Sequence, residues 1–197
     1  MNFANELRRK SIHAASSVFP IAYWFIDKRT MLLILGPMLI VWLIIEALRH
    51  HSPTVGGLVK RYFGGLFRDF EDKALSGAAY VLIANVLTIA LFPKEVAIPG
   101  LLMLSISDAL ASLVGMSVGG PRFLGKSWSG SAAFFVSAAA IALTTLPDHP
   151  IAGVIAAAVT TVVEALPLRW RHFRIDDNFS IPLSAGLSLI AAMRLFA

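Results

Sequence analysis

The sequence predicts an all-α, polytopic bundle of membrane-spanning helices. Of its 197 residues 57% are hydrophobic and only 15% are charged, and apolar segments of helix length recur along the chain. A soluble domain carries roughly 25% charged residues. The chain has no cysteine, which excludes disulfides and thiolate metal sites. We expect a single integral-membrane domain over residues 1–197.

Apolar segments that approach the roughly 20 residues needed to cross a bilayer predict about seven spans. The first could instead be a signal peptide, but Ser16, Ser17 and Pro20 interrupt its apolar run and no small-residue cleavage site follows. The segments are 11–27, 31–48, 75–92, 95–117, 129–146, 150–166 and 179–196.

The distribution of Lys and Arg predicts the orientation, because cytoplasmic loops of membrane proteins are rich in both. If the N-terminus is cytoplasmic, 13 of the 17 Lys and Arg residues fall inside. Seven spans then place the C-terminus outside. Residues 50–73, which alternate aromatic or apolar with basic side chains, are typical of an interfacial segment on the cytoplasmic leaflet.

The connection from Gly120 to Ser127 matches the phosphate-loop pattern G-x-x-x-x-G-K-[ST]. In soluble proteins this pattern works between a strand and a helix, whereas here apolar helical segments flank it. We interpret it as a turn between membrane helices in which Gly125, Lys126 and Ser127 can approach phosphate oxygens at a helix start. The alternative is a plain connection with one basic residue. If the match to the soluble phosphate loop is convergent, we expect Gly120 to tolerate alanine.

Asp108 is the acid that lies deepest in an apolar segment. It precedes the predicted cytoplasmic end of its segment by nine residues, or about 14 Å. A carboxylate at this depth is costly and usually marks a functional site, although a structural pair with a cation is the alternative. Ser105, Ser112 and Gly115 share its helix face. Glu46 and Glu164 lie near predicted cytoplasmic helix ends, where each could be solvated.

Further polar clusters lie on the same predicted side. Basic residues that neutralise phosphates, oxygen donors that suit Mg²⁺ and a buried acid near a lipid hydroxyl are components of phosphoryl transfer. The run from Asp176 to Asn178 also fits an ordinary helix N-cap. The clusters contain Arg8, Arg9, Lys10 and His13 near the N-terminus, and Arg174, Asp176, Asp177 and Asn178 before the last segment.

The order of these motifs resembles the family of dolichol kinases, phytol kinases and CTP-dependent diacylglycerol kinases. Members are polytopic membrane enzymes that phosphorylate a lipid alcohol, typically from CTP with a divalent metal. In the family loop Lys-Ser-x-Glu-Gly-Ser, Ser129 here replaces the Glu, whose role would be absent or moved to Glu164 or Asp176. The motifs are ELRRKxxH near the N-terminus, RxxE at Arg68–Glu71, SDALASLVG at Ser107–Gly115, GKSWSGSAAF at Gly125–Phe134, EAL from Glu164 and DDNFSIPL from Asp176.

The residues and the resemblance together predict a site. Asp108 is either a metal ligand or the base that accepts the hydroxyl proton. Ligands of Mg²⁺ or another divalent cation are predicted to be Asp108, Asp177 and Asn178. The other predicted roles are catalysis by Asp108, Lys126 and Glu164, nucleotide binding by Arg9, Lys10, Gly115, Gly125, Lys126 and Ser127, and secondary roles for Arg8, His13, Arg68, Glu71 and Asp176.

The predicted function is transfer of phosphate from CTP to a polyprenol, a phytol-like prenol or diacylglycerol, with no nucleic acid as partner and a homo-oligomer left open. One alternative is CDP-lipid synthesis of the phosphatidate cytidylyltransferase type, but the chain lacks the Lys-Asp and His-Gly-Gly-x-x-Asp-Arg signature expected near the end of that family. Another is a small cation- or proton-coupled transporter that uses Asp108, but the polar residues gather at one membrane face rather than at the midplane.

Overall fold

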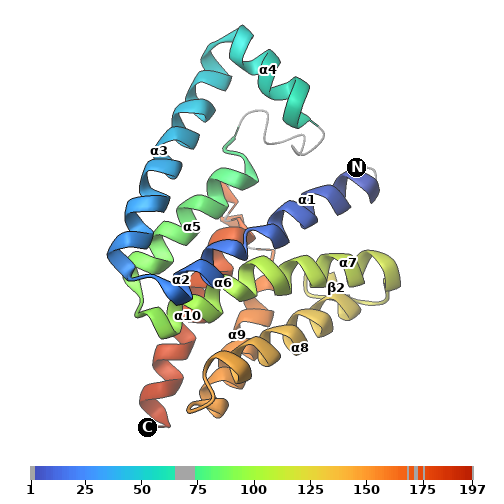
Figure 1. The fold of residues 1–197 in the computed structure, drawn as a ribbon. Helices are drawn as coiled ribbons and strands as arrows, with labels where there is room; N and C mark the ends of the chain where they lie inside the picture. The colour runs from blue at the N-terminus through green and yellow to red at the C-terminus, as the bar shows by residue number, and fades with distance from the viewer. Residues whose placement is uncertain (1–2, 65–73, 168, 171–172, 175, 197) are drawn as a thin grey trace.

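The structure is a computed structural model that describes residues 3–64, 74–167, 169–170, 173–174 and 176–196. These residues form helices joined by short connections, with two small β-hairpins (Figure 1). The helices are α1 (Phe3–Ala15), α2 (Val18–Phe25), α3 (Lys28–His51), α4 (Pro53–Phe63), α5 (Gly77–Leu91), α6 (Lys94–Leu102), the π-helix η3 (Met103–Ser107), α7 (Asp108–Val118), α8 (Trp128–Thr145), α9 (Pro150–Ala165) and α10 (Asp177–Leu195). The hairpins pair β1 (Arg122–Phe123) with β2 (Lys126–Ser127), and β3 (Arg169–Trp170) with β4 (Phe173–Arg174).

Within the described residues, four helical segments are long and apolar enough to cross a membrane. They are Lys28–His51, Lys94–Val118, Trp128–Thr145 and Asp177–Leu195, and α6, η3 and α7 form the second of them without a break. The shorter apolar helices α5 and α9 match two further predicted segments. The all-α class is confirmed, and these helices are consistent with a multi-pass membrane protein.

The predicted first span, residues 11–27, is not one helix. The chain turns at Ser16 and Ser17, so this segment is divided between the charged helix α1 and the eight-residue helix α2. Eight residues rise only about 12 Å, far less than the about 30 Å of a hydrocarbon core. A single spanning helix here was therefore wrong, while seven crossings and the orientation stay predictions.

Side-chain caps define where several helices begin. Asp27, Ser76, Ser127 and Asp176 each accept a hydrogen bond from a backbone N–H in the first turn of α3, α5, α8 and α10, respectively. Such caps satisfy amides that have no partner within the helix. The predicted N-cap at the start of the last segment is confirmed, since the side chain of Asp176 accepts from Asn178 N at 3.0 Å.

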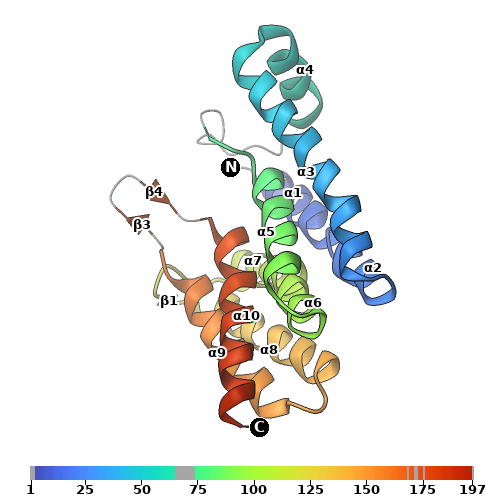
Figure 2. The same ribbon diagram turned by 90° about the vertical axis from the view of Figure 1, so that its left-hand side faces the viewer.

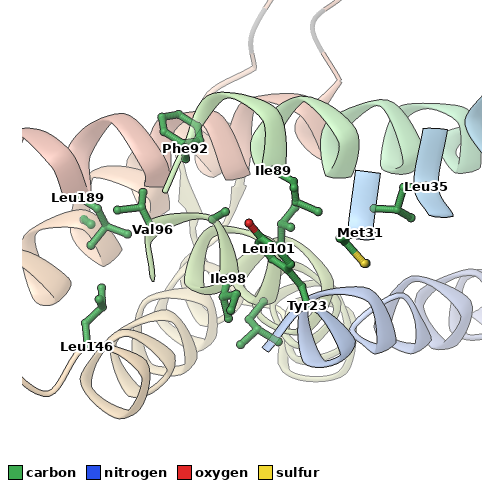
Figure 3. Packing of buried hydrophobic residues seen from close by; sticks show 13 residues of the cluster. Tyr23, Met31, Leu35, Ile89, Phe92, Val96, Ile98, Leu101, Leu146 and Leu189 are labelled. Carbon is green, nitrogen blue, oxygen red and sulfur yellow. The ribbon is translucent and has the colours of Figure 1, made fainter. Parts of the chain in front are cut away.

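The core places the segment Lys94–Val118 inside the bundle. Around α6, buried side chains of α2, α3, α5 and α10 pack together, among them Tyr23, Leu35, Ile89 and Leu189 (Figure 3). A second buried cluster surrounds η3 with side chains of α8 and α10. The end of α10 lies at the bottom of both views, and α1 begins higher up, below α4 (Figures 1 and 2). Because the segment Lys94–Val118 lies inside the bundle, Asp108, the first residue of α7, is enclosed by protein.

Thiol labelling can test the predicted orientation, because the chain contains no cysteine. Thr54, Leu124 and Asp148 are exposed, and we would replace each singly by cysteine. A membrane-impermeant thiol reagent added to intact cells should label only the cysteine at position 148, because the Lys and Arg bias places the other two inside. Permeabilised cells, in which all three should react, are the control. Labelling at position 54 or 124 in intact cells would contradict the orientation.

Candidate active site

The deepest acid is paired with a lysine from the first helix. Lys10 Nζ lies 2.5 Å from Asp108 Oδ2, and the two side chains are 4% and 1% exposed. His13, three residues further along α1, places Nε2 3.4 Å from the same oxygen. Residues three apart share a helix face, so one face of α1 is fixed to Asp108. The other oxygen, Asp108 Oδ1, is buried and has no hydrogen-bond partner among the described residues.

An irregular helical segment leads directly into Asp108. The π-helix η3 (Met103–Ser107) ends one residue before it, and π-turns within helices are frequent at functional sites. The carbonyl oxygen of Leu104, within this segment, lies 2.8 Å from His13 Nε2. Because a carbonyl can only accept, His13 Nε2 donates and therefore carries a proton. The segment thus orients the imidazole beside the carboxylate.

A second charged cluster lies at the predicted phosphate-binding turn. Lys126 Nζ lies 2.8 Å from Glu164 Oε1 and 3.4 Å from Asp177 Oδ2, so it joins β2 to the end of α9 and the start of α10. Glu164 is buried, which makes its interpretation as a solvated boundary residue wrong. Burial alone would lower the pKa of Lys126, but the carboxylates of Asp177 and Glu164 outweigh it and raise that pKa. Lys126 is therefore a firmly protonated cation.

The turn itself is a small hairpin that is docked on α9. Arg122 pairs with Ser127, and Gly125 N donates to the carbonyl oxygen of Ala165 at 2.8 Å. Gly120 has a φ of 111°, a conformation that side chains rarely adopt. The expectation that Gly120 tolerates alanine is thus wrong, because the backbone conformation requires glycine there whether or not phosphate binds.

Small residues bring α7 and α8 into close contact beneath the hairpin. A Cβ atom on Gly115 would lie 2.7 Å from Ser127 Oγ, and one on Gly130 would lie 2.8 Å from the backbone oxygen of Ala111. Small residues at membrane-helix interfaces allow this approach. Gly115 therefore positions Ser127 and the hairpin, in addition to any contact that it makes with a ligand.

Gly130→Ala should destabilise the protein by about 1–3 kcal/mol, because the added methyl meets backbone that cannot move cheaply. Thermal unfolding in detergent would measure the loss. Gly36→Ala is the matched control, since nothing lies within 4 Å of the methyl that it would add. Equal melting temperatures for the two variants would contradict the close packing.

Comparison with known proteins identifies the relatives of this chain. It is 34% identical over 192 residues to an uncharacterized protein of Rickettsia prowazekii, covering 95% of this chain and 94% of that protein. The chain belongs to the family of this rickettsial protein. The identity is 31% over 137 residues to CTP-dependent diacylglycerol kinase 1 of Eremothecium gossypii, with 67% of this chain and 43% of the kinase covered. The identity is 28% over 206 residues to a probable chloroplastic phytol kinase of Triticum aestivum, and the match covers 92% of this chain and 66% of that protein.

The predicted resemblance is thus confirmed as distant homology to CTP-dependent diacylglycerol kinase and phytol kinase. The chain spans less than half the length of the fungal kinases that it matches. No family model matches the chain, and no solved structure matches it.

A polar cavity of about 370 Å³ lies between the hairpin and α7. Its volume is within the usual range for small-molecule sites, about 300–1,000 Å³. The predicted residues Lys126, Glu164 and Ser127 line it, together with Arg122 and Glu6. Neither of these last two is among the predicted site residues, although Glu6 begins the ELRRKxxH motif. The cavity presents cations and carboxylates together, which suits a nucleotide phosphate chain with its metal.

The remaining predicted residues are more dispersed. Arg9 pairs with Glu6 within α1, Arg8 is exposed, and the side chain of Asp176 caps α10. Arg68 and Glu71 lie outside the described residues. Lys10, predicted to bind nucleotide, pairs with Asp108 rather than pointing to the hairpin.

Glu46, at the end of α3, has a structural role. It is buried, and its Oε2 accepts from Arg49 Nη2 at 2.6 Å. The same guanidinium nitrogen donates to the carbonyl oxygen of Ala74 at 2.9 Å, which ties α3 to the residues before α5. The prediction that Glu46 could be solvated was therefore wrong.

The predicted metal ligands do not form a complete cage. The described residues contain no group of three or more His, Asp or Glu that could hold an ion by themselves. Asp108 Oδ1 and Glu164 Oε2 are nevertheless buried carboxylate oxygens without a hydrogen-bond partner among the described residues. Mg²⁺ is commonly held by one or two carboxylates plus substrate phosphates rather than by protein alone. The donors that are present therefore fit an Mg²⁺ ion that arrives with a nucleotide.

Proposed function

We propose that this chain is a membrane lipid-alcohol kinase that transfers the γ-phosphate of CTP to the hydroxyl of a prenol or of diacylglycerol. One observation carries the proposal. The helix α1 holds the buried carboxylate of Asp108 through Lys10 and also contributes Glu6 to the cavity that Lys126 and Glu164 line. The distant homology to CTP-dependent kinases supports the choice of donor.

In the proposed step, the lipid hydroxyl oxygen attacks the γ-phosphorus, the bond to the β–γ bridging oxygen breaks, and CDP leaves. Lys126 neutralises charge on the phosphate oxygens, where a fixed cation stabilises the transition state. Asp108 receives the hydroxyl proton on Oδ1, since Lys10 and His13 occupy the side of Oδ2. Holding Mg²⁺ is the other role open to this carboxylate. Mg²⁺, when bound, supplies further charge neutralisation at the phosphates.

Glu164 takes the place of the carboxylate that the family loop carries where this chain has Ser129. Glu164 Oε1 lies 2.8 Å from Lys126 Nζ, so an acid accompanies the loop lysine although it comes from α9. Ser129 has a different task, because its Oγ donates to the carbonyl oxygen of Gly119 at 2.5 Å and closes the turn.

The test is a phosphoryl-transfer assay on purified protein. CTP or ATP labelled at the γ-phosphate is supplied with Mg²⁺ and with geranylgeraniol, phytol or dioleoylglycerol. Labelled phospholipid together with CDP is the expected result, with loss of product in EDTA and recovery on adding Mg²⁺. In a parallel reaction with phosphatidate as the added lipid, label in pyrophosphate together with a CDP-lipid product would indicate a cytidylyltransferase instead. No transfer to any alcohol by folded protein would overturn the proposal.

A further inference from the structure

A second cavity, of about 430 Å³, shares no lining residue with the cavity at the hairpin. Its wall comes from α1, α2, α3 and α5, with one residue from α10, and most of it is apolar. The apolar lining includes Ile12, Val18, Phe19, Met38, Trp42 and Val81.

The mouth of this cavity faces the surroundings of the bundle. Ile12, Val18 and Met38 line it and are 56%, 57% and 41% exposed. Exposed apolar side chains are favourable on a membrane protein where they meet lipid tails rather than water. In a bilayer, a mouth with these side chains would open laterally to the hydrocarbon. The turn at Ser16 and Ser17, which ends α1 and separates it from α2, contributes Ser16 to its wall.

Hydroxyl and indole groups along the wall are already satisfied by protein. Trp42 Nε1 donates to Ser76 Oγ at 3.2 Å, and Ser16 Oγ donates to the carbonyl oxygen of His13 at 2.6 Å. Such engaged groups present little polar character to an occupant. The wall along its length is therefore suited to a hydrocarbon chain.

His13 connects this apolar cavity to the charged centre. Its imidazole lines the cavity, and Nε2 lies 3.4 Å from Asp108 Oδ2. A polar end formed with Arg9 and Asn178 completes the lining. One end thus lies at the imidazole that contacts the Asp108 carboxylate, and the remainder is apolar.

We propose that this cavity binds the hydrocarbon chain of the lipid alcohol and places its hydroxyl at the polar end beside His13, next to Asp108. The inference rests on the proposed function, because it assigns a place to the acceptor of that reaction. The ligand chemistry is an apolar chain that ends in a hydroxyl group. CTP then enters by the polar cavity at Lys126, so the two substrates approach Asp108 from two separate cavities.

A bulky substitution at the wall tests the assignment. Ala78 lines the cavity and is exposed, so Ala78→Trp can fill it without disturbing the core. We expect KM for the lipid alcohol to rise about tenfold or more, which corresponds to about 1.4 kcal/mol, with KM for CTP unchanged. Ala140→Trp, on an exposed position of α8 that does not line the cavity, is the matched control and should leave both constants unchanged.

Photo-crosslinking gives a readout that does not depend on turnover. Diazirine-bearing geranylgeraniol and diazirine-bearing dioleoylglycerol form two arms, and mass spectrometry locates the labelled peptides. We expect labels on α2, α3 and α5 in at least one arm. Unlabelled alcohol should compete more strongly than an alkane of equal length, which lacks the hydroxyl for the polar end, and Ala78→Trp should remove the label. The arm that labels identifies the acceptor class.

The outcomes separate the two proposals. Competed labelling at the cavity without any phosphoryl transfer would leave the binding site standing and overturn the kinase. Phosphoryl transfer by Ala78→Trp with an unchanged KM for the lipid, or labelling confined to α8 and α9, would overturn the cavity assignment and leave the kinase standing.

Discussion

Asp108→Asn is expected to reduce phosphoryl transfer by about 10²–10⁴-fold, the usual effect of removing a general base. Asparagine is close in size and keeps a hydrogen-bonding oxygen, but it can neither accept the hydroxyl proton nor offer a charged ligand to Mg²⁺. The carboxylate is enclosed by protein, and its Oδ1 is free of protein partners within the described residues. Turnover with CTP, Mg²⁺ and the accepted lipid alcohol measures the loss.

The ion pair with Lys10 complicates this variant, because the substitution leaves a buried ammonium without its partner. Breaking a buried pair from one side typically costs about 3–5 kcal/mol of stability. We therefore expect Asp108→Asn to melt earlier than the parent. The double variant Lys10→Met/Asp108→Asn removes both charges at similar volume and should recover most of the melting temperature.

Activity of the double variant separates a structural role from a chemical one. If Asp108 serves the reaction, the double variant should be stable and inactive, with Lys10→Met alone as the background for comparison. A stable double variant with the turnover of the parent would remove Asp108 from the mechanism and leave the pair as a structural tie between α1 and α7.

Lys126→Ala is expected to lower kcat/KM for CTP by at least about tenfold, or about 1.4 kcal/mol. The ammonium is the cation that lines the polar cavity beside Glu164, and its loss leaves charge on the phosphate oxygens unneutralised. Lys126→Arg keeps the charge and should retain more activity than Lys126→Ala. Lys60→Ala, an exposed position on α4, changes the net charge equally and should have little effect.

Glu164 supplies a second control for the same site. Because it is buried against Lys126, Lys126→Ala leaves its carboxylate without this partner. Lys126→Ala/Glu164→Gln should regain stability without regaining activity. Recovery of kcat/KM in that double variant would contradict a role for the lysine in phosphate binding.

The contribution of Lys126 to the pH dependence of stability follows from the direction of its pKa shift. Its pKa in the folded protein is raised, so the stability from its ion pairs is fully present below the unfolded pKa of about 10.4 and is lost only as pH rises through the higher folded value. No alkaline loss of stability or activity below about pH 10 should arise from this residue. If stability or activity declined within the neutral pH range, and Lys126→Arg moved that decline to another pH, this assignment would be contradicted.

Composition and segment length were enough to predict a helical membrane bundle. Apolar runs near 20 residues have few alternatives in a bilayer, and six of the predicted segments match helices within the described residues. The prediction of one helix for the first segment was wrong, because the mean hydropathy of the segment does not reveal the turn of the backbone at Ser16 and Ser17. Local capping signals were readable too, since Asp176 caps the helix that its motif predicted.

The sequence also singled out Asp108 and Lys126, because a charge inside an apolar segment and a lysine after glycine are local features. It could not show which residue forms an ion pair with each of these two. Lys10 meets Asp108 from 98 positions away, and Glu164 meets Lys126 from another helix. Only tertiary packing decides which charges share a buried space, since helices distant in sequence are brought together by side-chain fit that no short pattern encodes. The apolar cavity has the same origin, because its wall comes from helices that packing alone makes neighbours.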